Sequence, residues 1–219
     1  MLTNFSPNMI KTYIDCPKKY YFRYIENVNV PQSVTPFEKG KKIHALANYY
    51  LQKIKIDRIE TALNDREKAA WELLKSNPFY NMDYLKSEFS LMIRLSEGKQ
   101  NFRVGGRLDA VVHKEKDLYI LDYKTGSTPK NPEYDFQTMI YLLCAKRYFK
   151  DFKTISFVYI NLKDKNNYVI KLTDELEKKY EELVAKECET ILSDKLYSCK
   201  ISDNCKRCEF YKICPHDEK

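Results

Sequence analysis

Two neighbouring strand candidates, each with one aspartate among apolar residues, constrain the fold of this chain more than any other feature. Residues 105–112 carry Asp109, residues 118–124 carry Asp122, and the stretch between them is short and polar. This pattern predicts a β-hairpin. A turn centred in that stretch places the two aspartates directly opposite each other, with Cβ atoms about 4.5–5.5 Å apart. A register slipped by one residue would instead put them on opposite faces of the sheet.

The paired aspartates predict a site for a divalent cation. Like charges that face each other destabilise a sheet, and a bound cation relieves their repulsion. Carboxylate oxygens are the ligands that Mg²⁺ and Mn²⁺ prefer. Lys124 lies two residues after Asp122 and therefore points to the same side. It would orient a water that the cation activates, or offset charge on a phosphate. The alternative is that both acids lie on a solvent-exposed face.

The other segments predict one α/β domain over residues 1–219, with a central mixed β-sheet flanked by helices. Its helical N-terminal part would span residues 1–80, its catalytic sheet and helix 81–172, and its C-terminal helix and cysteine-rich tail 173–219. Strands are expected at residues 85–94, 102–113, 117–124, 154–161 and 167–172. Five helices are expected. The first runs from Ser6-Pro7 to a break at Cys16-Pro17 and carries Ile10, Tyr13 and Ile14 on one face. The others run from Thr35-Pro36 to about Lys53, from Ile59 to Ser76, from Asn131-Pro132 to about Phe149, and from Thr173 to about Ser193.

Composition and charge indicate where the protein acts and what kind of partner it binds. Hydrophobic residues make up 43% of the chain, and no apolar run approaches the roughly 18 residues of a membrane span. We therefore expect a cytoplasmic protein without a membrane partner. The net charge of +7 suits an anionic partner. Basic and aromatic residues alternate near the N-terminus, as in proteins that bind single-stranded nucleic acid: Lys11, Tyr13, Lys18, Lys19, Tyr20, Tyr21, Phe22, Arg23 and Tyr24. Further lysines follow, namely Lys39, Lys41 and Lys42. The alternative is that most of these aromatic residues pack in the core.

The seven cysteines predict a metal centre near the C-terminus. Cys205, Cys208 and Cys214 follow the spacing C-x₂-C-x₅-C, and a C-x₂-C pair can grip one metal from a tight turn. A fourth thiolate is needed, and either Cys16 or Cys199 would supply it. Four thiolates suit zinc as well as iron–sulfur, so the spacing leaves the metal open. Two more cysteines lie within predicted helices, where we expect buried thiols: Cys144 and Cys188.

Four short motifs, taken together, resemble the core of the PD-(D/E)xK nuclease superfamily, in its RecB-like branch. They are Gly40-Lys41-Lys42-Ile43-His44, Gly106-Arg107-Leu108-Asp109-Ala110-Val111, Leu121-Asp122-Tyr123-Lys124-Thr125-Gly126, and Gln137 followed by Tyr141. The family's proline before the first acid is absent here, since Leu108 occupies that position. The resemblance implies a restriction-endonuclease-like core.

The resemblance also implies a role for each matched residue. The metal ligands would be His44, Asp109, Asp122 and the carbonyl oxygen of Tyr123. Lys124 would be the catalytic lysine. Gln137 and Tyr141 would complete the catalytic set by steadying the lysine or the DNA backbone, since residues four apart share one helix face.

The N-terminal stretch Asp15-Cys16-Pro17-Lys18-Lys19-Tyr20-Tyr21-Phe22 resembles the iron–sulfur subgroup of this branch. The subgroup comprises AddB-type proteins and CRISPR-associated RecB-like exonucleases. In it, one N-terminal cysteine joins three C-terminal cysteines around a 4Fe–4S cluster. The resemblance therefore implies Cys16, Cys205, Cys208 and Cys214 as ligands, with Cys199 as the main alternative to Cys16. Such a cluster would join the N- and C-terminal segments of the chain.

These inferences predict a metal-dependent deoxyribonuclease that hydrolyses phosphodiester bonds with Mg²⁺ or Mn²⁺. We expect an exonuclease on single-stranded DNA or unwound ends. None of the five glycines fits a Walker A motif, so a helicase would be a separate partner, as would a CRISPR integrase. The subgroup implies DNA repair and recombination or CRISPR adaptation. Asp122 favours the former, because the CRISPR-associated members more often carry glutamate there.

Two other functions are compatible with the sequence. One is a non-cleaving iron–sulfur module that binds DNA ends. The other is a zinc-stabilised interaction protein whose acids are surface residues.

Overall fold

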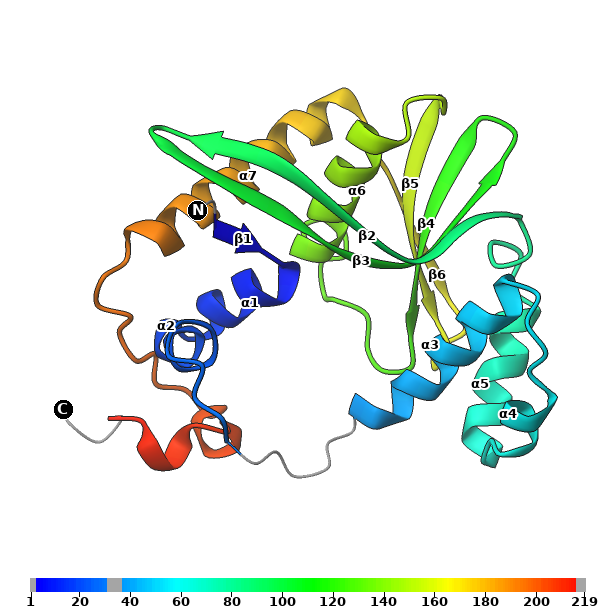
Figure 1. Ribbon diagram of the computed structural model, residues 1–219, viewed down its shortest axis with the longest axis horizontal. Helices are drawn as coiled ribbons and strands as arrows, with labels where there is room; N and C mark the ends of the chain where they lie inside the picture. Colours follow the sequence, from blue (N-terminus) through cyan, green and yellow to red (C-terminus); the bar gives the residue numbers. More distant parts are fainter. Residues whose placement is uncertain (1–2, 31–36, 216–219) are drawn as a thin grey trace.

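The computed structural model of the chain describes residues 3–30 and 37–215 (Figure 1). Within these ranges a six-stranded sheet has the order β1-β3-β4-β5-β6, with β2 also paired to β3. The pairs β2–β3, β3–β4 and β5–β6 are antiparallel, whereas β1–β3 and β4–β5 are parallel. The expected mixed sheet is confirmed. Its strands are β1 Thr3–Phe5, β2 Asp83–Glu97, β3 Gln100–Lys114, β4 Asp117–Lys124, β5 Thr154–Asn161 and β6 Asn167–Lys171.

Helices cover both faces of this sheet. Alternate side chains of the strands feed two apolar layers, because successive strand residues point to opposite faces. Leu118 and Ile120 of β4 pack with α1, α6 and α7, and Leu121 and Tyr123 pack with α3 and α5. The helices are α1 Pro7–Asp15, α2 Pro17–Tyr20, α3 Phe37–Leu51, α4 Asp57–Thr61, α5 Asp65–Lys75, α6 Phe136–Tyr148 and α7 Asp174–Ser193. A π-helical turn Tyr21–Ile25 follows α2, and short 3₁₀ turns Cys205–Arg207 and Tyr211–Ile213 lie in the tail.

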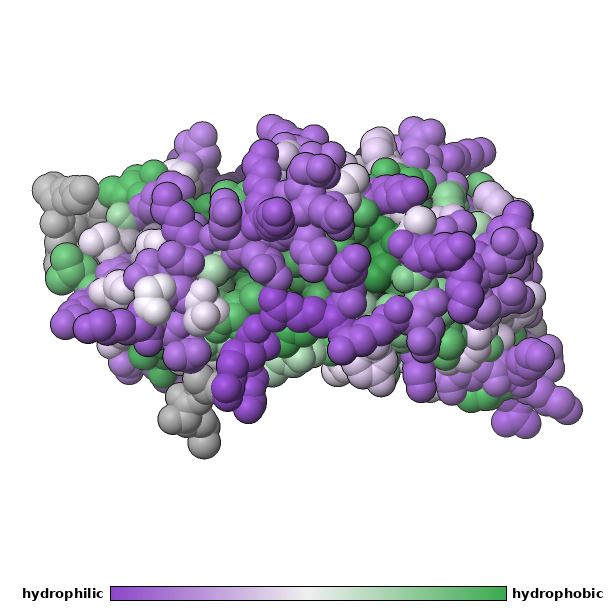
Figure 2. Space-filling model, turned by 90° about the horizontal axis from the view of Figure 1, so that it is seen from above, coloured by the Kyte–Doolittle hydropathy of each residue, from purple (hydrophilic) through white to green (hydrophobic). Residues whose placement is uncertain are grey.

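Polar side chains cover most of the face seen from above in Figure 2, with apolar side chains showing only in patches between them. Among the described residues, the helices are all too short or too polar to cross a bilayer.

Several helix ends lie where the sequence predicts them. The Ser6 side chain accepts a hydrogen bond from the Met9 amide at 3.3 Å and starts α1. The Thr173 side chain does the same for α7, from the Leu176 amide at 3.2 Å. Cys16 is extended between α1 and α2, as expected for a residue before proline.

Other expectations about the helices were wrong. The helix expected over residues 59–76 is two helices, because Asn64 and Glu67 form a capping box that starts α5 afresh. α6 begins at Phe136 rather than at Asn131-Pro132, since Asp135 provides the cap. The expected start at Thr35-Pro36 lies outside the described residues, and β1 was not predicted.

The hairpin of β3 and β4 has the register expected from the sequence. Ala110 pairs with Leu121 and Lys114 pairs with Asp117, and the ladder ends one position before Asp109 and Asp122. On the other side of β3, Ser87 pairs with Ala110 and Phe89 with Leu108. Glu88, which has a positive φ of 47°, therefore lies across from Asp109.

Gly105 of β3 lies against the backbone of β2. A Cβ atom at Gly105 would lie 2.1 Å from the carbonyl oxygen of Leu91 on β2. Backbone atoms cannot yield as a flexible side chain can, so any larger residue must separate the two strands.

We predict that Gly105→Ala lowers the free energy of unfolding by about 1–3 kcal/mol, as other overpacked sites do. Gly126→Ala is the matched control, because its Cβ would meet nothing within 4 Å. Its effect should stay within about 1 kcal/mol. Urea unfolding of both variants measures this difference. A Gly105→Ala protein as stable as the wild type would contradict the assigned strand contact.

Candidate active site

The predicted acids and lysine lie just beyond the paired part of the β3–β4 hairpin, at the end away from its turn. Asp109 accepts a hydrogen bond through Oδ2 from the Tyr123 amide at 3.1 Å. Lys124 Nζ lies 2.8 Å from Asp122 Oδ2. Oδ2 is buried, and the Lys124 ammonium group is the partner that lies against it. The side chain of Asp122 is only 5% exposed.

His44 reaches this point from α3, on the other side of the site. Its Nδ1 lies 3.1 Å from Asp109 Oδ1, and its Nε2 lies 3.0 Å from the carbonyl oxygen of Tyr123. Both ring nitrogens face acceptor oxygens, which a doubly protonated imidazolium satisfies. Burial opposes a charge on His44, but the hydrogen bond and negative charge of Asp109 outweigh it, and the pKa of His44 is raised.

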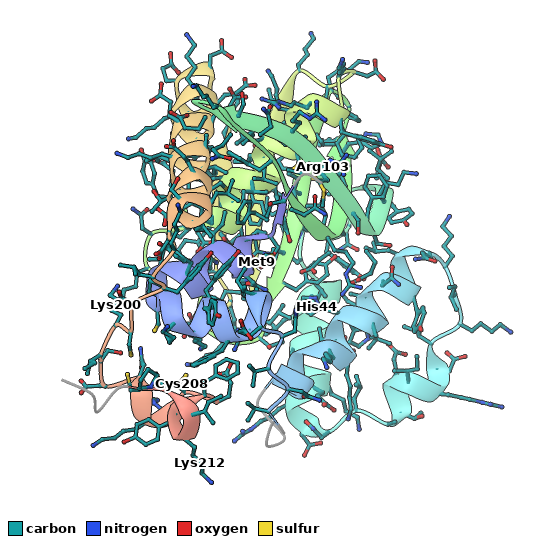
Figure 3. The ribbon with its side chains drawn as sticks, turned by 60° about the vertical axis from the view of Figure 1, so that its left-hand side comes forward. Met9, His44, Arg103, Lys200, Cys208 and Lys212 are labelled. Carbon is teal, nitrogen blue, oxygen red and sulfur yellow. The ribbon has the colours of Figure 1, made fainter. Side chains whose placement is uncertain are left out.

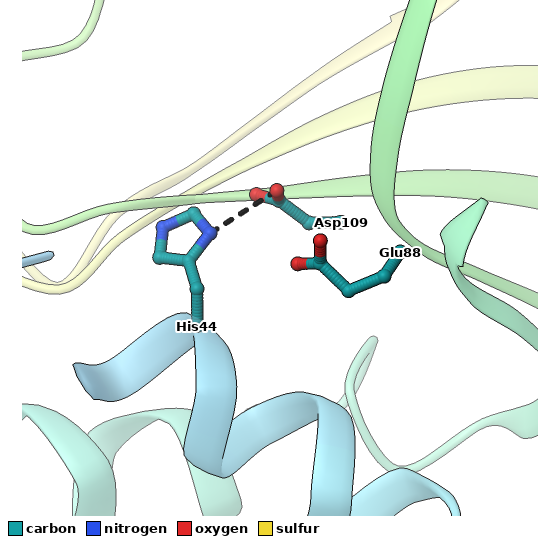
Figure 4. A group of neighbouring side chains, drawn as sticks. All are labelled: His44, Glu88 and Asp109. Carbon is teal, nitrogen blue, oxygen red and sulfur yellow. Dashed lines mark ion pairs between the residues drawn. The ribbon is translucent and has the colours of Figure 1, made fainter. Parts of the chain in front are cut away.

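Glu88 of β2 is a further acid of this site that the sequence did not reveal. Ligand atoms of His44, Glu88 and Asp109 all lie within 4.8 Å of one another (Figure 4). No motif marks Glu88, and it lies outside the hairpin of β3 and β4. Only the pairing of β2 with β3 places it across from Asp109, so a prediction of that register would have been needed to find it.

These residues fit a divalent cation. Burial raises the pKa of Asp122, and the nearby charge of Asp109 raises it further, although Lys124 and His44 oppose this shift. A cation would relieve both causes, since it supplies positive charge beside the two carboxylates. The adjoining pocket, of about 860 Å³, opens between α3 and the sheet. Other residues that line it are Lys41, Asn48, Tyr49, Arg107, Thr125 and Ser127.

Gln137 lies between the buried acid and the lysine. Its Nε2 donates to Asp122 Oδ1, and its Oε1 accepts from Lys124 Nζ at 3.1 Å. The side chain thus contacts both charged groups from the first turn of α6. Asp135 fixes that turn by accepting a hydrogen bond from the Gln137 amide at 2.9 Å. Asp135 is itself paired with Lys11 of α1 at 2.7 Å.

Tyr141 lies one turn further along α6 but contacts a different strand. Its hydroxyl donates to the carbonyl oxygen of Arg107 at 3.1 Å. Gly106 leaves room for the ring, because a Cβ there would lie 2.7 Å from the hydroxyl oxygen. Gln137 therefore touches the lysine, while Tyr141 holds the β3 backbone two residues before Asp109.

Five cysteines gather at a second pocket, of about 410 Å³, between the N-terminal helices and the tail. Those lining it are Cys16, Cys199, Cys205, Cys208 and Cys214. Figure 3 shows Cys208 below the N-terminal helices and His44 on α3, facing the strands. Burial raises the pKa of the Cys214 thiol to about 12, and the neighbouring Cys199, whose sulfur lies 3.6 Å away, contributes. Both candidates for the fourth ligand, Cys16 and Cys199, thus lie at this pocket.

Direct contacts also join the two ends of the described chain. Lys19 and Arg23 form ion pairs with Glu209, and the rings of Phe22 and Phe210 lie 5.4 Å apart. The tail and the N-terminal helices are therefore held together by the protein itself.

Some of the N-terminal basic and aromatic residues are engaged within the protein itself. Tyr13 and Tyr20 are buried in the core, and Lys11 is committed to Asp135. Lys42 is paired with Glu67. Charge and aromatic content alone could not distinguish residues that pack the core or pair with acids from residues available to nucleic acid.

We predict that the His44–Asp109 contact stabilises the metal-free protein at low pH. A group whose pKa is raised on folding contributes fully below its ordinary pKa, about 6.5 for histidine, and loses this contribution as pH rises through its folded-state pKa. The unfolding free energy of the wild type should therefore exceed that of His44→Gln by more at pH 6 than at pH 9, in EDTA. A difference that is constant or grows with pH would count against the ion pair.

Comparisons with known proteins agree with this geometry. The family model of the PD-(D/E)XK nuclease superfamily matches residues 4–215. A CRISPR-associated exonuclease Cas4 from Francisella tularensis subsp. novicida is 24% identical over 209 residues, which cover 94% of this chain and 91% of the relative. The crystal structure of a candidate exonuclease from Eubacterium rectale has the same fold, with a TM-score of 0.58, 10% identity, and coverage of 92% of this chain and 86% of the other. The chain therefore belongs to the PD-(D/E)XK nuclease superfamily and is a metal-dependent nuclease.

Proposed function

We propose that this nuclease is an exonuclease that hydrolyses single-stranded DNA or unwound ends with Mg²⁺ or Mn²⁺. One observation carries the proposal: the buried Asp122, held by Lys124 and Gln137, lies beside the His44–Glu88–Asp109 group, within one site. Oxygen and imidazole ligands of this kind suit hard divalent ions. When bound, the cation supplies Lewis-acid activation of water and of the phosphate.

The protein's own residues hold and orient the reacting groups. We infer that His44, Asp109 and Asp122, with Glu88 and the carbonyl oxygen of Tyr123, hold the cation. Lys124 is the catalytic lysine, because its ammonium group can orient the attacking water or offset charge that develops on the phosphate. Gln137 positions Lys124 through the hydrogen bond to Nζ. Tyr141 acts at one remove, by fixing β3 through Arg107.

We also propose a role in CRISPR adaptation, with an integrase as partner. The relative that carries the name CRISPR-associated exonuclease Cas4 aligns with nearly the whole chain, which supports this over repair and recombination. The glutamate-to-aspartate difference at Asp122 preserves the carboxylate and so preserves a metal ligand. A helicase partner would be expected instead if the chain acted in recombination.

The cysteine pocket is proposed to hold a 4Fe–4S cluster through Cys16, Cys205, Cys208 and Cys214. Its support is the convergence of these residues from the two ends of the described chain on one pocket. When bound, the cluster would tie the tail to α1 and α2, beyond the ion pairs already present. Cys205 Sγ accepts from the Ser202 amide at 3.3 Å, and Cys199 is the alternative ligand.

For catalysis, Lys124→Ala should lower the rate of single-stranded DNA cleavage by at least about a hundredfold, as loss of a positioned electrostatic group does. Lys150→Ala, outside the active-site pocket, should leave the rate within about twofold of wild type. Mn²⁺ and Mg²⁺ should each be tried with end-labelled DNA. Equal rates for wild type and Lys124→Ala would refute the assignment. DNA binding without cleavage, with metal and cluster present, would favour the non-cleaving end-binding module.

For the cluster, anaerobically purified wild-type protein should be brown and contain iron and acid-labile sulfide. Alanine at Cys16, Cys205, Cys208 or Cys214 should each remove most of the iron. Cys144→Ala is the matched control, since this buried thiol lies away from the pocket. Cys199→Ala should retain iron. If instead Cys199→Ala loses iron and Cys16→Ala retains it, Cys199 rather than Cys16 is the fourth ligand. Colourless protein with stoichiometric zinc would overturn the iron–sulfur assignment.

A further inference from the structure

Arg107 presents an exposed guanidinium at the edge of the active-site pocket. It lies on β3 two residues before Asp109, so both side chains project from the same face of the strand. Its side chain is 68% exposed, and Nε lies 2.8 Å from Glu88 Oε2. Glu88 faces Asp109 across the strands, so Arg107 reaches Glu88 diagonally. Both residues line the same pocket.

The backbone that carries this guanidinium is held in place. Tyr141 donates a hydrogen bond to the carbonyl oxygen of Arg107, and its ring occupies the space that Gly106 leaves. Lys124, by contrast, is already engaged by Asp122 and Gln137. The backbone of Arg107 is thus held in place, while its guanidinium is exposed and forms an ion pair with Glu88.

Glu88 has two competing partners. One is Arg107, and the other is a cation held with His44 and Asp109, since Glu88 belongs to that group. A divalent ion bound to the carboxylate would neutralise much of the charge that attracts the guanidinium. An exposed ion pair adds little to stability, so its loss costs the fold little.

We propose that Arg107 is the phosphate-binding residue of this site, held by Glu88 in the metal-free protein and released to the DNA backbone when the cation binds. The part that concerns DNA rests on the proposed nuclease function. A guanidinium presents its donors in a planar fork that matches two phosphate oxygens, which suits it to this task. Metal binding would then prepare the site for its substrate as well as for chemistry.

The first test measures binding of a fluorescein-labelled single-stranded DNA by anisotropy in EDTA, where cleavage cannot occur. Glu88→Gln should raise the affinity about two- to fivefold over wild type, because it frees Arg107. The gain should vanish in the double variant Glu88→Gln/Arg107→Met. Arg103→Met is the matched control, because this exposed arginine lies on the same strand away from His44 (Figure 3). The gain should persist in Glu88→Gln/Arg103→Met.

The outcomes of this test are distinct. A gain that survives removal of Arg107 would show a general charge effect and overturn the proposal. So would an unchanged affinity in Glu88→Gln.

The second test measures Mn²⁺ binding by titration calorimetry without DNA. Arg107→Met should bind Mn²⁺ about two- to fivefold more tightly than wild type, because Glu88 no longer has a competing partner. Arg103→Met should match the wild type. Equal or weaker Mn²⁺ binding by Arg107→Met would overturn the proposal that Arg107 and the cation compete for Glu88. The calorimetric test involves no DNA, so it judges the competition between Arg107 and the cation for Glu88 by itself. A failure of the proposed nuclease function would be seen separately, as no DNA cleavage by the wild type.

Discussion

The buried carboxylate of Asp122 is the constraint around which the rest of the site is arranged. A charged group in a protein interior is costly unless it is paired and hydrogen-bonded. Here Gln137 donates to one oxygen and Lys124 lies beside the other. Asp109 lies close enough that its charge raises the pKa of Asp122. The remaining cost is the repulsion between the two nearby carboxylates, which a divalent cation would remove.

Satisfying Asp122 draws on every layer of the fold. Gln137 depends on the cap that Asp135 provides for α6, and Asp135 is steadied by Lys11 from α1. On the other face, α3 brings His44 against Asp109 and the Tyr123 carbonyl. The central sheet supplies the acids, and each flanking layer supplies one group that orients them. A change in the packing of α1 or α3 is thus able to alter the geometry of the site without touching the acids.

Helix α1 connects the active-site pocket with the cysteine pocket. α1 ends at Cys16, which lines the cysteine pocket, and carries Lys11, which supports Asp135. A metal cluster that fixes the end of α1 would therefore also restrain the element that supports Gln137. This gives the cysteine pocket a physical link to catalysis that requires no electron transfer.

The sequence alone determined the hairpin of β3 and β4 and pointed to most residues of the candidate site. Strand alternation places Asp122 and Lys124 on the same face of β4, and the short polar turn brings β3 with Asp109 alongside, since these are local rules. Helix starts at Ser6 and Thr173 followed from local capping in the same way. The family motifs added His44 and Gln137, which no periodicity would have brought to the same point.

Only the tertiary structure decided the contacts that depend on long-range packing. Glu88 joins the site because β2 pairs with β3 in one register, and no local signal marks that pairing. Likewise, Tyr141 contacts Arg107 rather than Lys124, because α6 crosses two strands and its successive turns meet different ones. Tyr13 and Tyr20 entered the core for the same reason. Composition records which side chains a chain has, whereas their partners are fixed only when distant segments are packed against one another.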